Sequence, residues 1–158
     1  ASVRADVTRA QLVAPVVGKI IKTLQKVYRD KGVNCLQEMD DQARFYGDQG
    51  DLMEFLGNLL ENAFKYCHGT VSVRVECDRV ESGTRQPLSI SIGDDGAGIP
   101  ESEWKRVLGG GERQDQQQQG QGIGLSVADD IIRLYGGELE IGRSDLGGAE
   151  IRVSFSNG

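Results

Sequence analysis

Hydrophobic residues recur at spacings of three and four in three long stretches of the chain, and each stretch predicts an amphipathic helix. The first helix is expected over residues 11–31, with an apolar stripe made of Val13, Val17, Ile20, Leu24 and Val27. Pro15 lies near its start, where proline is tolerated, and Gly32 is in the usual position to end it. We expect the stripe to pack against a sheet of the same domain; alternatively, the first turns continue a helical connection from an upstream domain.

The second expected helix follows residues 47–51, which place acidic side chains where a helix dipole favours them. Its apolar stripe consists of Leu52, Phe55, Leu56, Leu59 and Ala63. The third helix is expected over residues 122–135, with Ile123, Val127, Ile131 and Leu134 on one side. A short additional helix is predicted over residues 101–107, directly after Pro100.

Alternation of apolar and polar residues predicts the strands. They are expected at residues 33–39, 43–46, 71–77, 88–92, 139–141 and 149–155. Asp40-Asp41 joins the first two strands, and the turn at Gly147-Gly148 joins the last two. Because helices and strands follow one another in this order, the chain is expected to form an α+β two-layer sandwich.

Composition narrows the class of protein. A length of 158 residues suits one domain with a substantial core, and no apolar run approaches the ~18 residues of a membrane span. The formal net charge of −6 argues against nucleic acid or anionic lipid as the main partner. Cys35, Cys67 and Cys77 lack metal-site spacing and are expected to be reduced thiols. The single histidine, His68, excludes a multi-histidine metal centre.

The second helix carries the first candidate site residues. At about 100° per residue, Asn58, Asn62 and Lys65 fall within a narrow arc away from the apolar stripe, with Tyr66 at its edge. Carboxamide oxygens suit Mg²⁺, and a lysine beside them suits phosphate. The alternative is an ordinary amphipathic helix with a polar outer face.

A second candidate lies at the end of the strand over residues 88–92. Strand alternation directs Asp94 to the same face as the core residues, where an unpaired charge is costly, so this carboxylate needs a hydrogen-bond donor. A bound ligand with an N–H group is a candidate donor. Gly96 and Gly98 follow, and glycines let the backbone turn tightly and approach a flat ligand. The alternative is a simple turn between a strand and a helix.

The third candidate is the glycine-rich run from Gly120 to Leu125, which opens the third helix. Glycines at the start of a helix expose its first N–H groups, and these groups suit phosphate. The spacing fits neither the Walker P-loop nor the dinucleotide-binding fingerprint. Residues 108–121, rich in glycine and glutamine, are expected to form a loop before this helix.

The three motifs, in this order, resemble the ATP-binding domain of sensor histidine kinases, within the larger group that also holds gyrase, Hsp90 and MutL. The resemblance covers residues 12–155, and Lys26–Val33 together with Lys65-Tyr66-Cys67 is most similar to the PhoQ-type branch. It implies a mixed, mostly antiparallel sheet of about five strands with three main helices on one face. The implied ligands are ATP and Mg²⁺.

The resemblance implies a role for each motif. Asp94 would accept a hydrogen bond from the adenine amine, Tyr66 would pack on the base or ribose, and Lys65 and Arg113 would neutralise phosphate charge. Residues 108–121 would form a lid over ATP. Mg²⁺ would lie among Asn58, Asn62 and Gln121. The full set placed at ATP is Asn58, Asn62, Lys65, Tyr66, Asp94, Gly96, Gly98, Ile99, Arg113, Gly120, Gln121, Gly122, Ile123, Gly124 and Leu125.

The chain departs from the family pattern in three places. Leu108 stands where a phenylalanine is usual before the lid, and glutamines occupy residues 116–119, where the PhoQ-type pattern has a second arginine. The resemblance therefore implies that this chain lacks one of the cationic side chains that would contact the terminal phosphate. There is also no phosphoacceptor segment of the kind that carries the phosphorylated histidine, and His68 is in the wrong place for that role.

The resemblance implies a domain that binds Mg·ATP and transfers the γ-phosphoryl to a histidine on a separate dimerisation domain of the same kinase, which in turn engages a response regulator. It further implies a monomeric cytoplasmic domain of an inner-membrane sensor, with residues 1–11 as the remnant of a linker. A non-catalytic nucleotide-sensing or partner-binding module of the same fold is the alternative. An ATPase is disfavoured because Asn58 stands where such enzymes carry the glutamate that activates water, and a serine kinase fits the whole-chain resemblance less well.

Overall fold

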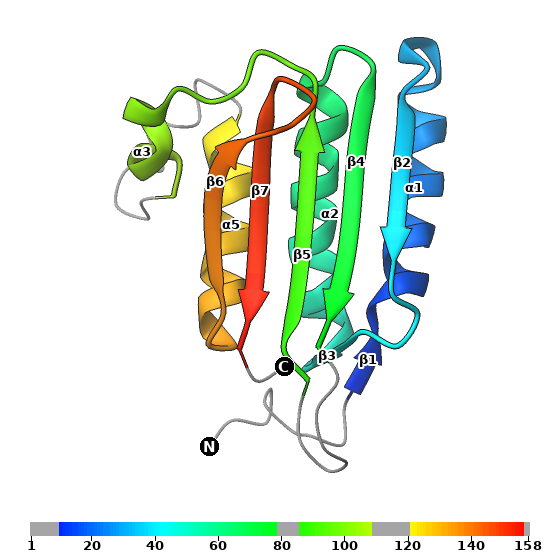
Figure 1. The fold of residues 1–158 in the computed structure, drawn as a ribbon, viewed down its shortest axis with the longest axis vertical. Helices are drawn as coiled ribbons and strands as arrows, with labels where there is room; N and C mark the ends of the chain where they lie inside the picture. Colours follow the sequence, from blue (N-terminus) through cyan, green and yellow to red (C-terminus); the bar gives the residue numbers. More distant parts are fainter. Residues whose placement is uncertain (1–9, 79–85, 109–120, 157–158) are drawn as a thin grey trace.

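The computed structural model describes residues 10–78, 86–108 and 121–156, which form a layer of helices against a sheet (Figure 1). The helices are α1 (Val13–Val27), α2 (Gln49–Tyr66), α3 (Trp104–Leu108) and α5 (Gln121–Leu134), with the 3₁₀ helices η2 (Arg29–Lys31) and η3 (Glu101–Glu103). The strands are β1 (Ala10–Leu12), β2 (Asn34–Met39), β3 (Arg44–Tyr46), β4 (Thr70–Cys77), β5 (Leu88–Asp94), β6 (Glu138–Arg143) and β7 (Ala149–Phe155). Within these ranges, no helix has the length and apolar character needed to cross a membrane.

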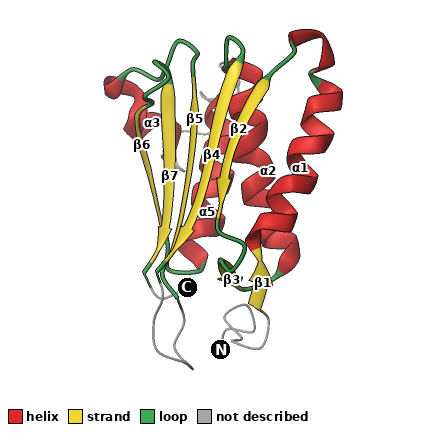
Figure 2. Cartoon of the chain, turned by 45° about the vertical axis from the view of Figure 1, so that its right-hand side comes forward, coloured by secondary structure: helices red, strands yellow, loops and turns green. Residues whose placement is uncertain are grey.

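Five strands form the main sheet in the order β2-β4-β5-β7-β6. The β2 strand runs parallel to β4, whereas the other three pairs are antiparallel. The helices α1, α2 and α5 cover one face of this sheet (Figure 2). The expected α+β two-layer sandwich, with a mixed and mostly antiparallel sheet, is therefore confirmed.

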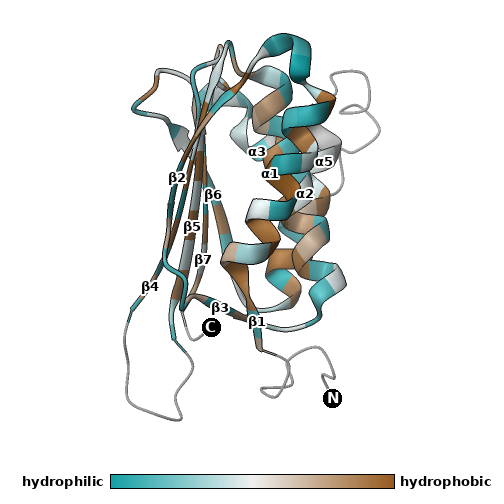
Figure 3. Cartoon of the chain, turned by 90° about the vertical axis from the view of Figure 1, so that its right-hand side faces the viewer, coloured by the Kyte–Doolittle hydropathy of each residue, from teal (hydrophilic) through white to brown (hydrophobic). Residues whose placement is uncertain are grey.

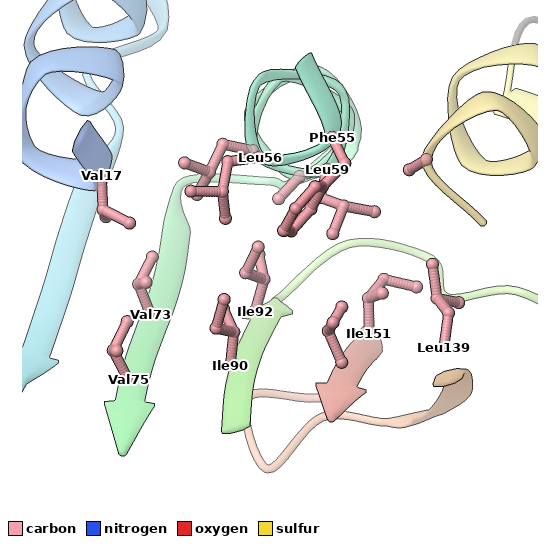
Figure 4. Packing of buried hydrophobic residues seen from close by; sticks show 14 of the residues in the cluster. Val17, Phe55, Leu56, Leu59, Val73, Val75, Ile90, Ile92, Leu139 and Ile151 are labelled. Carbon is pink, nitrogen blue, oxygen red and sulfur yellow. The ribbon is translucent and has the colours of Figure 1, made fainter. Parts of the chain in front are cut away.

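The core lies between the sheet and the helices, where the apolar sides of both layers meet (Figure 3). Leu56 and Leu59 of α2 point toward the strand residues beneath them, including Ile92 of β5 (Figure 4). All three side chains are at most 1% exposed. Burying each of them contributes roughly 1.5–3 kcal/mol to folding. This packing holds α2 over the middle of the sheet and thereby places its polar side.

The first helix is shorter than predicted. Residues 10–12 form β1, which pairs with β3 in a separate two-stranded sheet, so α1 begins only at Val13. The predicted stripe is also wrong at its end, since Val27 is 65% exposed while Val16 and Ile21 are buried. An α-helix has 3.6 residues per turn, so a stripe with heptad spacing drifts around it and leaves the sheet by the last turn. Gly32 ends η2 in the left-handed conformation, at φ +64°.

The strands expected at residues 33–39 and 43–46 are both present, as β2 and β3, but they do not pair with each other. The N–H of Asp40 donates to the carbonyl of Val75, which keeps the end of β2 on β4. The chain then turns through Gln42, whose N–H donates to Asp40 Oδ1 at 2.8 Å. These hydrogen bonds separate the two strands into different sheets.

The apolar side of α5 differs from the predicted one. Leu125, Ala128 and Ile132 are buried, whereas Leu134 is 60% exposed. The helix packs on both α2 and α3, so its buried face is wider and rotated relative to a single stripe. Even Asp129 is buried at 2% exposure, and its Oδ2 accepts a hydrogen bond from Arg133 Nε at 2.9 Å. The existence of the helix was predicted correctly, but its orientation was not.

Candidate functional site

The candidate residues gather at one end of the molecule, where the carboxyl ends of α2 and β5 meet the amino end of α5 (Figure 1). The start of α2 is set by Asp48, whose Oδ2 accepts from the N–H of Asp51 at 3.0 Å. Such a side-chain cap satisfies one of the free N–H groups of the first turn. The helix then runs for about five turns and brings Asn62 and Tyr66 beside Asp94 at the end of β5.

Asp94, the last residue of β5, is a buried carboxylate at 5% exposure. Its Oδ1 accepts hydrogen bonds from the backbone N–H groups of Gly96 at 2.8 Å and Ala149 at 3.2 Å. A ligand N–H was the candidate donor expected from the sequence, but the chain itself supplies two donors to Oδ1, one from Gly96 and one from the start of β7. Among the described residues, no hydrogen bond reaches Oδ2.

The ionisation of Asp94 reflects this burial. Loss of solvent raises the pKa of the carboxyl above its ordinary value of 3.8, while the two backbone N–H groups act in the opposite direction. Asp95 adds to the rise and His68 opposes it. The site is therefore built around a carboxylate that gains stability from an additional donor.

Glycines allow the backbone to lie directly against this carboxylate. A Cβ on Gly96 would lie 2.2 Å from the carbonyl oxygen of Tyr66, and one on Gly148 would lie 2.1 Å from Asp94 Oδ1. Gly98 has a φ of +80°, which L side chains rarely adopt. The predicted need for glycine at positions 96 and 98 is thus explained by close approach at the first and by conformation at the second.

Asp95 fastens the loop that follows α2. Its Oδ1 accepts from the N–H groups of His68 at 2.8 Å, Gly69 at 3.0 Å and Thr70 at 3.1 Å. Burial alone would raise the pKa of Asp95, but the three N–H groups outweigh it and lower the pKa below 3.8. His68 lies in this loop and contributes its backbone N–H to the arrangement.

A small cavity of about 50 Å³ lies against Asp94. It is lined by Asn62, Tyr66, Asp94, Ala97, Gly98, Ile99 and Ala149. Ile99 is 7% exposed and supplies an apolar wall opposite the polar groups. An apolar slot with one convergent carboxylate suits a flat heterocycle that carries an N–H donor.

A larger polar cavity of about 300 Å³ adjoins the first and shares Asn62 and Tyr66 with it. It is lined by Tyr28, Asn58, Glu61, Asn62, Lys65, Tyr66 and Gly124. Within the described part of the chain, the carboxamides of Asn58 and Asn62 make no hydrogen bond, so both are available to a ligand. Carboxamide oxygens one turn apart fit a hard divalent cation such as Mg²⁺.

Among the described residues, two lysines from different elements bring positive charge to this region. Lys65 Nζ lies 5.4 Å from the ring centroid of Tyr66 and lines the larger cavity. Lys31 Nζ, from η2, donates to the carbonyl oxygens of Phe64 at 2.9 Å and Lys65 at 2.8 Å. A cation at the carboxyl end of a helix satisfies its free carbonyls and favours its dipole. Lys31 therefore holds the turn of α2 that carries Lys65 and Tyr66.

The structure brings most of the predicted site residues together. Eight of them line the two cavities: Asn58, Asn62, Lys65, Tyr66, Asp94, Gly98, Ile99 and Gly124. Gly96 bonds to Asp94 instead of lining a cavity, and Leu125 is part of the core. Arg113 and Gly120 lie outside the described residues, as does most of the expected lid. Gln121, Gly122 and Ile123 are described only as the helical backbone that begins α5.

Sequence reasoning missed Tyr28, Glu61, Ala97 and Ala149, which also line the cavities. Glu61 could have been predicted from helix geometry, since it lies roughly 60° from Asn58 around α2. Ala149 could not have been predicted, because its contact with Asp94 depends on the pairing of β5 with β7. Tyr28 follows α1 and reaches the site only because α1 and α2 pack side by side (Figure 2).

The sequence and the fold place the chain in a known class of protein. Residues 47–157 match the family described as "Histidine kinase-, DNA gyrase B-, and HSP90-like ATPase", and the chain belongs to this family. This confirms the family expected from the three motifs.

Curated relatives place the chain near one branch of that family. It is 43% identical over 148 residues to "Two-component sensor PhoQ" of Pseudomonas aeruginosa, covering 94% of this chain and 32% of that protein. It is 40% identical over 143 residues to "Virulence sensor histidine kinase PhoQ" of Salmonella typhimurium, covering 90% of this chain and 28% of that protein. The chain thus spans about a third of the length of the curated relatives that it matches.

Solved structures agree on the fold. A mycobacterial sensor histidine kinase, MprB, superposes with a TM-score of 0.76 at 22% identity, over 94% of this chain and 97% of that one. The ATP binding domain of PrrB from Mycobacterium tuberculosis gives a TM-score of 0.73 at 19% identity, over 94% and 96% of the two chains. At these identities the likeness concerns the arrangement of helices and strands.

Proposed function

We propose that this chain binds Mg·ATP and transfers the γ-phosphoryl group to a histidine on a separate domain of a two-component sensor kinase. The observation that carries the proposal is the buried Asp94 carboxylate, with one oxygen bonded to the backbone and the other facing no described donor beside a small apolar cavity. The adenine amine is the N–H donor that this oxygen would accept from. Ile99 and the backbone of Gly98 would pack on the base.

The larger cavity is suited to the polyphosphate. Lys65 supplies a positive charge, and Gly124 belongs to the first turn of α5, where free N–H groups favour anions. Asn58 and Asn62 of α2 would hold Mg²⁺, with Gln121 at the start of α5 as a third ligand. When bound, Mg²⁺ neutralises phosphate charge. The chain's own contribution is to orient the phosphates between α2 and α5.

The residue types favour transfer over hydrolysis. Phosphoryl transfer depends largely on position and charge neutralisation, so a binding domain can support it without a nucleophile of its own. Asn58 carries a carboxamide, which cannot take a proton from water as a general base. We therefore infer that the acceptor is a protein histidine presented at the open side of the larger cavity.

The relatives are sensors about three times as long as this chain. We infer that the chain is the cytoplasmic catalytic part of an inner-membrane sensor, and that a dimerisation domain of the same kinase presents the histidine and engages the response regulator.

The test is to mix this chain with the histidine-bearing domain of its own kinase and γ-labelled ATP. We expect label on the histidine domain in an acid-labile, base-stable form, with only slow release of free phosphate when the chain is alone. ATP binding without any transfer would favour the alternative, a nucleotide-sensing module of the same fold. Rapid release of phosphate by the chain alone would contradict the proposal.

A further inference from the structure

Tyr28 lines the larger cavity from the side of α1, although no motif includes it. It directly follows the last residue of α1, and its side chain is half-buried. Its N–H donates to the carbonyl of Leu24, and its own carbonyl accepts from the N–H of Lys31. The tyrosine backbone is therefore held at the junction between α1 and η2.

The order of residues around α2 shows which end of the ligand Tyr28 would meet. Tyr66 and Asn62 lie on the side of the small cavity at Asp94. Continuing around the helix, Asn58 and Lys65 come next, and Glu61 follows roughly 60° from Asn58, away from Tyr66. Tyr28 lines only the larger cavity, together with Asn58, Glu61 and Lys65. A molecule with its base at Asp94 would therefore present its opposite end to Tyr28.

The ring of Tyr28 is held in place by two contacts. It packs on Phe64 with ring centroids 6.1 Å apart and an interplanar angle of 46°. Lys31 Nζ lies 6.0 Å from the Tyr28 centroid while it also caps the end of α2. A side chain that is already ordered loses little conformational entropy when its hydroxyl binds a ligand.

The electrostatic surroundings keep the phenol in its donor form. Burial raises the pKa of Tyr28 above 10.0, and the Glu61 carboxylate raises it further, while the Lys65 cation acts in the opposite direction. The hydroxyl thus carries its proton at neutral pH. A neutral O–H donor beside the lysine is suited to a phosphate oxygen, because it adds a hydrogen bond where Lys65 supplies the charge.

We propose that Tyr28 is a further binding residue of the nucleotide site, whose hydroxyl donates a hydrogen bond to the terminal phosphate of ATP. The proposal rests on the proposed function, since it requires the base at Asp94 and the phosphates along α2. Tyr28, at the end of α1, would then help the site to distinguish a nucleoside triphosphate from a diphosphate.

The test compares the whole chain with its Tyr28→Phe variant, which keeps the ring and removes only the hydroxyl. Binding of a non-hydrolysable ATP analogue, ADP and adenosine is measured by calorimetry with Mg²⁺ present. We expect the variant to lose about threefold to tenfold in affinity for the ATP analogue. Its affinities for ADP and adenosine should be unchanged, since these ligands lack the terminal phosphate.

Tyr46→Phe, on β3 and outside both cavities, is the matched control and should bind all three ligands as the unaltered chain does. Equal affinity of Tyr28→Phe and the unaltered chain for the ATP analogue would overturn the role of Tyr28. An equal loss for the ATP analogue and ADP would also overturn it, because the contact would not be with the terminal phosphate. If the unaltered chain bound none of the three ligands, the proposed function itself would be contradicted.

Discussion

Asp94 Oδ1 and the N–H of Ala149, which are 55 residues apart in sequence, are joined by a hydrogen bond of 3.2 Å. A second bond joins the same segments in the same direction, since the N–H of Gly148 donates to the backbone carbonyl of Asp94 at 3.0 Å. The turn between β6 and β7 thus orients the carboxylate at the end of β5. Changes in that turn should therefore act on the site even though they lie far from α2.

Gly148→Ala tests this dependence. The new Cβ would lie 2.1 Å from Asp94 Oδ1, which two backbone N–H groups hold, and 2.6 Å from the backbone nitrogen of Gly96. We expect a loss of about 2–4 kcal/mol in the free energy of unfolding by urea, together with weaker binding of ATP. Gly142→Ala in β6 is the control, because nothing lies within 4 Å of its Cβ. Equal stability of the two variants would show that the turn can move away.

The Asp95 carboxylate predicts a pH dependence of stability. Its pKa is lower in the folded chain than its ordinary value of 3.8, so its contribution is fully present above that value and is lost as the pH falls through the folded pKa. We expect Asp95→Ala to reduce the free energy of unfolding by about 1–3 kcal/mol at pH 7, because three backbone N–H groups lose their acceptor.

The difference between Asp95→Ala and the unaltered chain should shrink as the pH is lowered from 5 toward and below 3.8. Chemical unfolding at several pH values measures it. A difference that stays constant over this range would mean that the ionised carboxylate is not what holds His68, Gly69 and Thr70.

Lys31→Met should loosen the last turn of α2. The ammonium donates to the carbonyls of Phe64 and Lys65, and methionine keeps most of the aliphatic stem while removing both hydrogen bonds. We expect a cost of about 1 kcal/mol in stability and faster hydrogen exchange at the amides of Lys65 and Tyr66. Lys22→Met, an exposed lysine in α1, is the control. Unchanged exchange at both amides would show that the end of α2 is held by packing alone.

Asn58→Glu tests why the site transfers phosphate and does not hydrolyse ATP. A carboxylate at this position can act as a general base toward water, which a carboxamide cannot. We expect the variant to release free phosphate faster than the unaltered chain and to transfer no more phosphate to the histidine domain. Asn58→Gln, which keeps the carboxamide, should not gain hydrolysis. Improved transfer by Asn58→Glu would contradict the role given to Asn58.

The sequence predicted the parts of the site that depend on local geometry. Asn58, Asn62 and Lys65 share an arc because they lie on one helix, and their spacing alone determines that arc. It could not predict the distant partner of Asp94, because the N–H of Ala149 is brought there by the antiparallel pairing of β5 with β7. Periodicity likewise predicted α5 but not its buried face, which depends on packing against both α2 and α3.

The most direct test of the central claim is calorimetric titration of the chain and of Asp94→Asn with a non-hydrolysable ATP analogue and Mg²⁺. The asparagine oxygen can still accept from Gly96 and Ala149, but its amide then presents a donor toward the adenine amine, which is also a donor. We expect saturable binding at one site that needs Mg²⁺, and at least about a tenfold loss of affinity in the variant. Absence of saturable binding, or equal affinity of the two proteins, would contradict the account.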